Sequence, residues 1–247
     1  MKIPKTHPRY ISLTTRHVLE HGVKTGITSL NGLIAHGRGE AFDYLLGEKT
    51  HTFAKEAIAE AANVLLAAKH PVISVNGNTA ALVAKEFIIL SKLLRCPLEV
   101  NIFHTSKKRE QKIKKHLLNK GAKDVFLAEK KYVIDGLLSN RRYVNGKGIY
   151  LADVVFVPLE DGDRAEALIK NGKKVITIDL NPLSRTAKTA TITIIDNIVR
   201  ALPLLVGEII KQKKSKKLAL QKYDNKQILK QAVAFLRKGK YGSGGPS

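Results

Sequence analysis

The chain has 247 residues, of which 44% are hydrophobic, enough to bury one large core or a core with a helical appendage. It carries 43 Lys and Arg against 21 Asp and Glu, a formal net charge of +22 that is typical of proteins that bind polyanions. No apolar run reaches the roughly 18 residues of a membrane span, and residues 1–10 contain no apolar signal region, so we expect a cytoplasmic protein without a membrane partner.

The N-terminal third of the chain is predicted to be helical. Tyr10–Glu20 has a mixed apolar period, and Ser29–Leu46 forms a second helical region. Within that second region, His36-Gly37-Arg38-Gly39 leaves both a helix and a loop open. Thr52–Lys69 is alanine-rich and periodic, which predicts a helix that ends before Pro71.

From residue 71 onward, strand and helix patterns alternate. Strands that read as continuous Val and Ile runs between helices are typical of a parallel sheet covered on both faces, so we expect an α/β fold. The expected strands are Val72–Val75, Leu98–Phe103, Val125–Leu127, Asp153–Val157, Val175–Ile178 and Thr191–Ile194. The expected helices are Thr79–Leu94, Ser106–Asn119, Lys131–Leu138, Arg164–Lys170 and Asn197–Ile210.

The same pattern divides the chain into three parts of one compact domain. Residues 1–70 form a helical region packed on the core, residues 71–210 the α/β core, and residues 211–247 a Lys-rich helix and a flexible tail. Much of the positive charge lies in Lys107–Lys115 and in the tail, as on solvated helix faces. Aromatic and basic residues do not interleave as in base-stacking platforms, so we do not expect a nucleic-acid partner.

Polar loops follow three of the expected strands. Because ligands of open α/β folds bind at the carboxyl ends of strands, these loops predict one shared crevice. In Asn76-Gly77-Asn78-Thr79, either Asn78 or Thr79 caps the next helix, whose free N–H groups favour a phosphate or carboxylate. Capping alone also explains this motif.

The other two loops carry charged side chains. Glu160-Asp161-Gly162-Asp163 suits Mg²⁺ or a substrate ammonium group, and helix capping by Asp163 is the structural alternative. In the loop 179–186, Asp179 suits a ribose hydroxyl, and Arg185 with Thr186 suits phosphate oxygens. A polar loop without a ligand explains the same residues.

Four further side chains lie outside these loops. Arg16 and Arg38 lie among small and hydroxyl residues, without the Glu partners of routine surface pairs, so anion binding is favoured for both. His104 follows a strand and precedes a cationic helix, where substrate contact and a structural role are both open. Cys96 is the single cysteine and is expected to be a buried thiol. No cysteine and histidine spacing predicts a zinc site, and we assign no metal ligands.

Long motifs occur in the chain in a characteristic order. They are HPRYISLTTRH, SLNGLIAHGRGEAFDYLLGE, PVISVNGNTAAL, VVFVPLEDGDRAEAL, and IDLNPLSRTA followed by ITIIDNIVRALP. Together they resemble the archaeal-type phosphopantothenate synthetases, also called 4-phosphopantoate–β-alanine ligases. The likeness runs from about His7 to Pro203 and leaves only the Lys-rich C-terminal part outside.

The resemblance implies a homodimer with a Rossmann-like core that condenses 4-phosphopantoate with β-alanine, using ATP as a substrate together with Mg²⁺. It implies release of AMP and diphosphate, through an acyl-adenylate, in coenzyme A biosynthesis. The ATP contacts that it implies are Arg16, Arg38, Asp179, Leu180, Asn181, Arg185, Thr186, Asn197 and Ile198. The substrate contacts that we expect, mainly from the chemistry of the loops, are Asn76, Asn78, Thr79, Glu160 and Asp161.

The catalytic group is not identified by the sequence, and Arg38, His104 and Arg185 are the candidates. Two other functions remain as alternatives. A regulatory protein that binds a nucleotide would keep the ATP loops without an adjoining acid or amine site. A basic nucleic-acid-binding protein would show polynucleotide affinity that falls steeply with salt.

Overall fold

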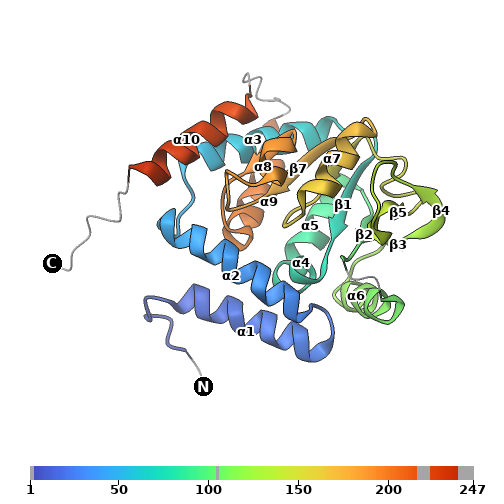
Figure 1. Ribbon diagram of the computed structural model, residues 1–247, viewed down its shortest axis with the longest axis horizontal. Coiled ribbons are helices and arrows are strands. Elements are labelled where there is room, and N and C mark those ends of the chain that lie inside the picture. The colour runs from blue at the N-terminus through green and yellow to red at the C-terminus, as the bar shows by residue number, and fades with distance from the viewer. Residues whose placement is uncertain (1–2, 104–105, 216–222, 239–247) are drawn as a thin grey trace.

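The computed structural model of the protein describes residues 3–103, 106–215 and 223–238. Within these residues, a six-stranded sheet in the order β3-β2-β1-β6-β7-β8 forms the centre, and every neighbouring pair of strands is parallel (Figure 1). The parallel α/β fold predicted from the alternating pattern is therefore confirmed. The strands are β1 Pro71–Val75, β2 Leu98–Val100, β3 Val125–Leu127, β6 Val154–Phe156, β7 Lys174–Ile178 and β8 Ile192–Ile194.

Helices precede, interleave and follow the strands. The longer ones are α1 Tyr10–Thr25, α2 Leu30–Leu45, α3 Thr52–Ala67, α5 Ala84–Leu94, α6 Lys107–Asn119, α7 Gly162–Lys170, α9 Ile198–Ser215 and α10 Asn225–Arg237. The short ones are α4 Gly77–Leu82, α8 Arg185–Thr189 and the 3-10 turn Asn140–Arg142. Within the described ranges, none of these helices combines the length and the apolar character needed to cross a bilayer.

Alternation along each strand separates the two faces of the sheet. In β1, Ile73 and Val75 join a large apolar cluster with side chains of α3, α5 and α9. Val72 points the other way and joins a second cluster with α7. Because strands buried on both faces have no solvated side, the sequence shows continuous apolar runs rather than alternation with polar residues.

The order of the strands reverses between β1 and β6. From β1 the chain proceeds through β2 to β3 on one side, and from β6 through β7 to β8 on the other. The loops that leave β1 and β6 therefore diverge at the carboxyl edge, which creates the crevice at which parallel α/β proteins bind ligands. The pair α1 and α2 lies side by side below this region in Figure 1 and contacts α4.

The prediction of a helix at Lys131–Leu138 is wrong. Glu129–Val133 is strand β4, paired antiparallel with β5, Tyr143–Val144. The apolar residues Tyr132 and Ile134 follow the two-residue period of a strand, and Asp135-Gly136 ends it, with Gly136 at a φ of 78°.

The structure resolves one open question about the helices and divides one predicted helix into two. The open question at His36-Gly37-Arg38-Gly39 is settled in favour of a helix, because α2 runs through these residues without interruption. The single helix predicted at Thr79–Leu94 is instead α4 and α5, which meet at Val83, whose φ of −137° is not helical. His104 lies outside the described residues.

Candidate functional site

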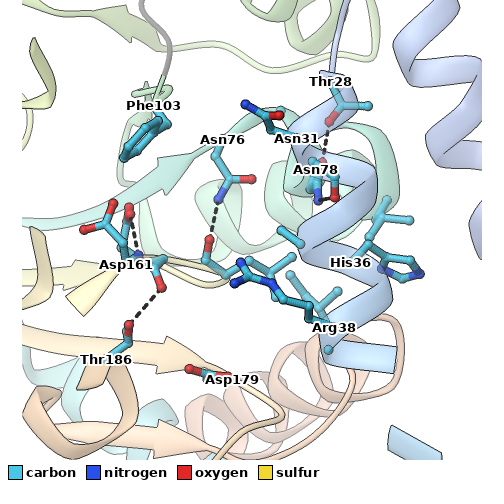
Figure 2. A pocket seen from close by; sticks show the side chains of 18 of the residues that line it. Thr28, Asn31, His36, Arg38, Asn76, Asn78, Phe103, Asp161, Asp179 and Thr186 are labelled. Atoms are coloured by element: carbon cyan, nitrogen blue, oxygen red, sulfur yellow. Dashed lines mark hydrogen bonds between the residues drawn. The ribbon is translucent and has the colours of Figure 1, made fainter. Parts of the chain in front are cut away.

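A cavity of about 610 Å³ lies at the carboxyl edge of the sheet, between α2 and the loops that follow β1, β6, β7 and β8 (Figure 2). Its volume is within the range typical of small-molecule sites. The loops that start at Asn76 and at Asp179 both line it, which confirms the prediction of a shared crevice. Of the residues expected to bind ligands, those that line the cavity are Arg38, Asn76, Asn78, Glu160, Asp161, Asp179, Leu180, Asn181, Thr186, Asn197 and Ile198.

The loop after β7 is held by its own side chains. The Asp179 carboxylate accepts one hydrogen bond from the Asn181 N–H at 2.9 Å and another from the Ser184 hydroxyl. Ser184 in turn accepts from the N–H of Ala187 at 2.9 Å and so begins α8. Burial raises the pKa of Asp179 despite these bonds. The loop therefore presents an acceptor with a fixed position at the tip of a strand.

The N-terminus of α9 faces the same cavity. Asn197 and Ile198 line it, and α9 extends over 18 residues from Ile198. The Asn197 amide donates to Asp43 at 2.7 Å and its oxygen accepts from the Val199 N–H at 3.2 Å. Arg200 also pairs with Asp43 at 2.5 Å, which fastens the end of α2 to α9. The positive end of a long helix dipole is thereby directed at the space where an anion would bind.

The three arginines expected at the nucleotide differ in their surroundings. Arg38 lines the cavity, and within the described part of the chain it has no ion-pair partner. Arg16 lies outside the lining and pairs with Glu40 at 3.0 Å. Arg185 also lies outside the lining and pairs with Asp163. The sequence-based statement that Arg16 lacks a Glu partner is therefore wrong, because the partner lies on the neighbouring helix.

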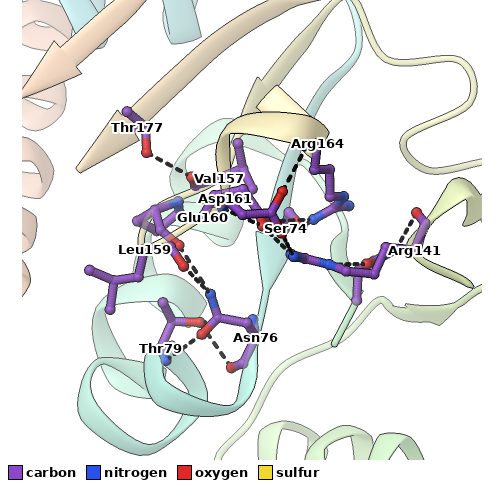
Figure 3. Close-up of polar contacts among 12 residues, drawn as sticks. Ser74, Asn76, Thr79, Arg141, Val157, Leu159, Glu160, Asp161, Arg164 and Thr177 are labelled. Carbon is purple, nitrogen blue, oxygen red and sulfur yellow. Dashed lines mark hydrogen bonds and ion pairs between the residues drawn. The ribbon is translucent and has the colours of Figure 1, made fainter. Parts of the chain in front are cut away.

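The acidic loop after β6 is an ion-pair network rather than a free cluster of carboxylates (Figure 3). The side chain of Glu160 is 1% exposed and pairs with Arg141 and, at 2.7 Å, with Arg164. Although burial acts to raise it, these two guanidinium groups hold the pKa of Glu160 below its ordinary value. Asp161 also pairs with Arg141, and its side chain stays 35% exposed. Asp161 is therefore the carboxylate of this network that a ligand can reach.

Asp161 also begins α7. Its side chain accepts from the N–H of Arg164 at 2.9 Å, so the capping expected of Asp163 belongs to Asp161. Burial, followed by the charge of Glu160, raises the pKa of Asp161. The buried Arg141 was missed by sequence reasoning because it lies far along the chain in the turn between β4 and β5.

The residues of the first polar loop have partners within the protein. The N-cap of α4 is Asn76, not Asn78 or Thr79 as expected from the sequence. Thr79 is fully buried, and its side chain and that of Asn76 form a reciprocal capping box at α4. The Asn78 amide donates to the Gly32 carbonyl at 2.8 Å and accepts from the Thr28 hydroxyl. A Cβ at Gly32 would lie 2.3 Å from Asn78, so glycine permits this close approach of α2 and α4. These contacts position the α1–α2 pair against the core.

Several other lining residues were not identified from the sequence. His36 lies on α2 one turn from the Glu40 pair, and burial lowers its pKa. Arg109, in the first turn of the basic helix α6, also lines the cavity. The sequence pattern of Lys107–Lys115 predicts only a solvated helix face, because it does not show which side of the helix meets the cavity. The remaining ones are Thr28, Ser29, Asn31, Gly32, Ala35, Gly39, Phe42, Leu82, Ile102, Phe103, Arg141, Leu159 and Ser184.

The donor groups at this site do not form a metal centre of their own. Among the described residues, no group of three His, Cys, Asp or Glu side chains is arranged to hold a metal ion. Glu160 is committed to two guanidinium groups, which do not leave its oxygens to a cation. Mg²⁺ usually binds through substrate phosphates with one or two carboxylates, so a magnesium ion here would arrive with its phosphate ligand.

The cysteine lies far from this chemistry. Cys96 is 4% exposed, which confirms the buried thiol expected from the sequence. Burial raises the pKa of its thiol to about 12.

The protein thus has the architecture of parallel α/β proteins that bind anionic ligands at a switch point of the sheet, with an arginine and a helix N-terminus directed at the cavity. The phosphopantothenate/pantothenate synthetase family matches residues 53–239 of the chain. The chain belongs to this family.

Proteins named 4-phosphopantoate–β-alanine ligase are similar over most of their length. That of Methanosarcina mazei is 49% identical over 239 residues, which cover 95% of this chain and 94% of the relative. That of Thermococcus kodakarensis is 48% identical over 242 residues, covering 96% and 93%. That of Methanospirillum hungatei is 56% identical over 200 residues, covering 81% and 82%.

Proposed function

We propose that the protein is an ATP-dependent ligase that condenses 4-phosphopantoate with β-alanine in coenzyme A biosynthesis, giving 4-phosphopantothenate, AMP and diphosphate. The observation that carries the proposal is the shared cavity, in which Arg38 on α2, Asp161 after β6 and Asp179 after β7 line one space. The relatives named as this ligase match along nearly the whole chain, which supports the same activity here.

ATP occupies the part of the cavity between α2 and the loops after β7 and β8. Asp179 accepts a hydrogen bond from a ribose hydroxyl, and the N–H groups at the start of α9, together with Arg38, bind phosphate oxygens. Arg16 and Arg185 reach the nucleotide only by leaving Glu40 and Asp163, so their contribution includes the cost of breaking those pairs. Mg²⁺ enters as part of the nucleotide substrate.

The two remaining substrates occupy the part of the cavity nearer β1, β2 and β6. Asp161 receives the ammonium group of β-alanine, since it is the exposed carboxylate of the network after β6. Its raised pKa suits a group that takes a proton from the amine before attack. Arg109 and the N-terminus of α2 favour the phosphate of the acid.

The reaction then proceeds in two steps. A carboxylate oxygen of 4-phosphopantoate attacks the α-phosphorus of ATP, the bond to the β-phosphate breaks, and diphosphate leaves. The neutral amine of β-alanine attacks the acyl carbon, the bond to AMP breaks, and the amine loses a proton. Positive charge from Arg38 and the α9 dipole stabilises the charge that develops on the phosphates, so catalysis relies on positioning and electrostatics.

The net charge of the chain fits this substrate set. ATP and 4-phosphopantoate together carry about six negative charges near pH 7, and a strongly basic protein concentrates such anions near its surface. The formal charge of +22 is therefore explained without a nucleic-acid partner.

One assay tests the proposal and separates it from its alternatives. The protein is incubated with ATP, Mg²⁺, 4-phosphopantoate and β-alanine, and AMP is measured. We expect AMP only when both other substrates are present. A nucleotide-binding regulator would bind ATP without this dependence, and a nucleic-acid-binding protein would bind polynucleotides with a steep salt dependence.

We also propose a homodimer with a Rossmann-like core in the cytoplasm. When the β4–β5 hairpin is set aside, the sheet order corresponds to the 3-2-1-4-5-6 order of such cores. The pair α1–α2 exposes apolar side chains, among them Ile11, Leu30 and Ile34, at 56%, 68% and 65%, which supports a contact between copies. Sedimentation equilibrium tests the dimer, and a monomer at micromolar concentration would contradict it.

A further inference from the structure

Leu159 has a backbone conformation that leucine rarely adopts. Its φ is 56°, in the left-handed region, where a Cβ crowds the following carbonyl oxygen. The other non-glycine residues with positive φ in the described chain are Glu48 and Arg95, and both lie just after helices, where this conformation is common. Leu159 instead lies in the loop after β6 and lines the cavity. Strain of this kind persists only where surrounding contacts impose it.

Asn76, which follows the neighbouring strand β1, forms side-chain hydrogen bonds with this loop. The Nδ2 group of Asn76 donates to the carbonyl of Pro158 and to the carbonyl of Leu159, both at 3.1 Å (Figure 3). These bonds bridge the two loops that diverge at the switch point of the sheet. The reverse orientation of the amide would place its oxygen against two carbonyl oxygens, which would repel it. The hydrogen-bond network therefore determines which side-chain atom of Asn76 is the nitrogen.

The remaining polar atoms of Asn76 are also hydrogen-bonded, so its side-chain orientation is fixed. Its Oδ1 atom accepts from the Thr79 N–H at 3.0 Å, and its own N–H donates to the Thr79 hydroxyl at 3.0 Å. The amide oxygen and both amide hydrogens are thereby used within the protein. This differs from the direct contact with the acid substrate that the sequence favours for Asn76.

We propose that Asn76 is a positioning residue, which holds Leu159 in the left-handed conformation and so fixes the cavity wall between the nucleotide and the acid. The proposal rests on the proposed ligase function of this cavity. The Leu159 N–H donates to Ile178 at 3.1 Å, and the next carbonyl, that of Glu160, accepts from Thr186 at 2.9 Å. The loop is therefore tied to β1 on one side and to β7 and α8 on the other. Without the Asn76 amide, Leu159 relaxes to negative φ and the wall changes shape.

The test is a cycle of substitutions that separates the amide from the backbone strain. Asn76→Ser keeps an oxygen that caps α4 but removes the donor to the two carbonyls. Leu159→Ala and Leu159→Gly both remove the leucine side chain, but only glycine adopts this φ without cost. Asn76→Ser is made in each of these two backgrounds. We expect kcat to fall about tenfold in the alanine background and less than threefold in the glycine background, with KM for ATP within about threefold in both.

A matched control is Asn171, at the C-terminal end of α7, whereas the loop that contains Leu159 precedes the N-terminal end of this helix. Asn171 also donates to two carbonyls, those of Asp135 and Ala167, at 3.0 and 2.8 Å, and neither residue has a positive φ. Asn171→Ser removes the same number of donors far from the cavity, and we expect kcat within about twofold of the parent. Equal losses from Asn76→Ser in the alanine and glycine backgrounds would overturn the proposal and indicate a direct ligand contact.

A second readout does not depend on ligase activity. Hydrogen exchange of the Leu159 amide is measured in the parent, in Asn76→Ser and in Asn171→Ser. We expect about tenfold faster exchange in Asn76→Ser alone, because the loop is released from β1. Unchanged exchange would overturn the proposal even if turnover could not be read. A parent protein with no AMP formation but with the expected exchange would instead contradict the proposed function and leave the positioning role standing.

Discussion

The two walls of the cavity differ in how their charged side chains are paired. Helix α2 forms one of them, the α2 wall, and the loops at the carboxyl edge of the sheet form the other, the sheet-edge wall. On the α2 wall, Arg38 has no ion-pair partner within the described residues. On the sheet-edge wall, the carboxylates of Glu160 and Asp161 balance the guanidinium groups of Arg141 and Arg164. The helical layer therefore carries a positive charge that a ligand can neutralise, while the sheet edge supplies a rigid shape with Asp161 as its accessible group.

The largest expected effect on kcat/KM comes from removing the phosphate of the acid substrate, not from a substitution in the cavity wall. A site that provides donors for a phosphate leaves them unsatisfied when the phosphate is absent, which typically discriminates by about 10⁴-fold or more. We therefore expect kcat/KM for plain pantoate to be lower than that for 4-phosphopantoate by about this factor. The measurement compares the two acids at fixed ATP and β-alanine. Equal values would remove the second anion from the description of the cavity.

The next effect concerns the rigidity of the sheet-edge wall. Arg141→Met leaves Asp161 without a guanidinium partner and leaves Glu160 with Arg164 alone, and removing one partner of a buried ion pair typically costs about 3–5 kcal/mol of unfolding free energy. Denaturant unfolding measures it. The matched control is Lys170→Met, which removes the exposed pair with Glu166, and this should cost about 0–1 kcal/mol. Similar costs for both variants would show that the network does not stabilise the wall.

The free charge of the α2 wall is tested by Arg38→Ala. Loss of a charged hydrogen bond to phosphate should cost about 2–4 kcal/mol of transition-state stabilisation, a fall in kcat/KM of roughly 30- to 1000-fold, with the fold intact. Arg185→Ala should also lower ATP-dependent turnover, but by less, because Arg185 must first leave Asp163. Steady-state kinetics with ATP varied gives both values. Activity within threefold of the parent for both variants would refute the nucleotide assignment.

The smallest effect lies beneath the sheet-edge wall, at Glu99 in β2. Its carboxylate accepts from the N–H groups of Ile149 and Asn145, in the segment that follows Arg141. Burial nevertheless raises the pKa of Glu99 to about 7. The native chain therefore keeps a proton that the unfolded chain releases near pH 4.5, so the unfolding free energy falls as pH rises between these values. The fall should be about 3 kcal/mol at most and should level off above pH 7.

The Glu99 effect is measured by denaturant unfolding from pH 4.5 to 8. Glu99→Gln should lack this part of the pH dependence, while Glu56→Gln, at an exposed position of α3, should retain it. Superimposable pH profiles for the parent and Glu99→Gln would show that Glu99 does not titrate in this range.

Local sequence patterns were enough to predict the strands of the sheet and many of the residues that line the cavity. Continuous Val and Ile runs, as in β7, mark strands buried on both faces, and the loop after Ile178 carries polar groups where parallel sheets bind ligands. At Lys131–Leu138 the sequence pattern did not distinguish a helix from a strand. The strand forms because it pairs with β5, and a local pattern contains no information about such a contact.

The charges were harder to predict because their partners are distant in sequence. Glu40 reaches Arg16 across two helices, and Arg141 reaches Glu160 from the β4–β5 turn. A sequence shows which residues carry charge, but not which charges cancel. The i, i+4 pair Glu160–Arg164 was the one local signal of this network.

The buried Cys96 has a practical consequence for spectroscopy. Because its thiol is inaccessible and its pKa is about 12, maleimide reagents near pH 7 find almost no thiolate to attack. A cysteine introduced at the exposed Ala35, which lines the cavity on α2, would then take up a fluorophore selectively without removal of the native residue. The Ala35→Cys variant would therefore carry a single dye at the wall of the cavity, where its fluorescence responds to whatever ligand enters.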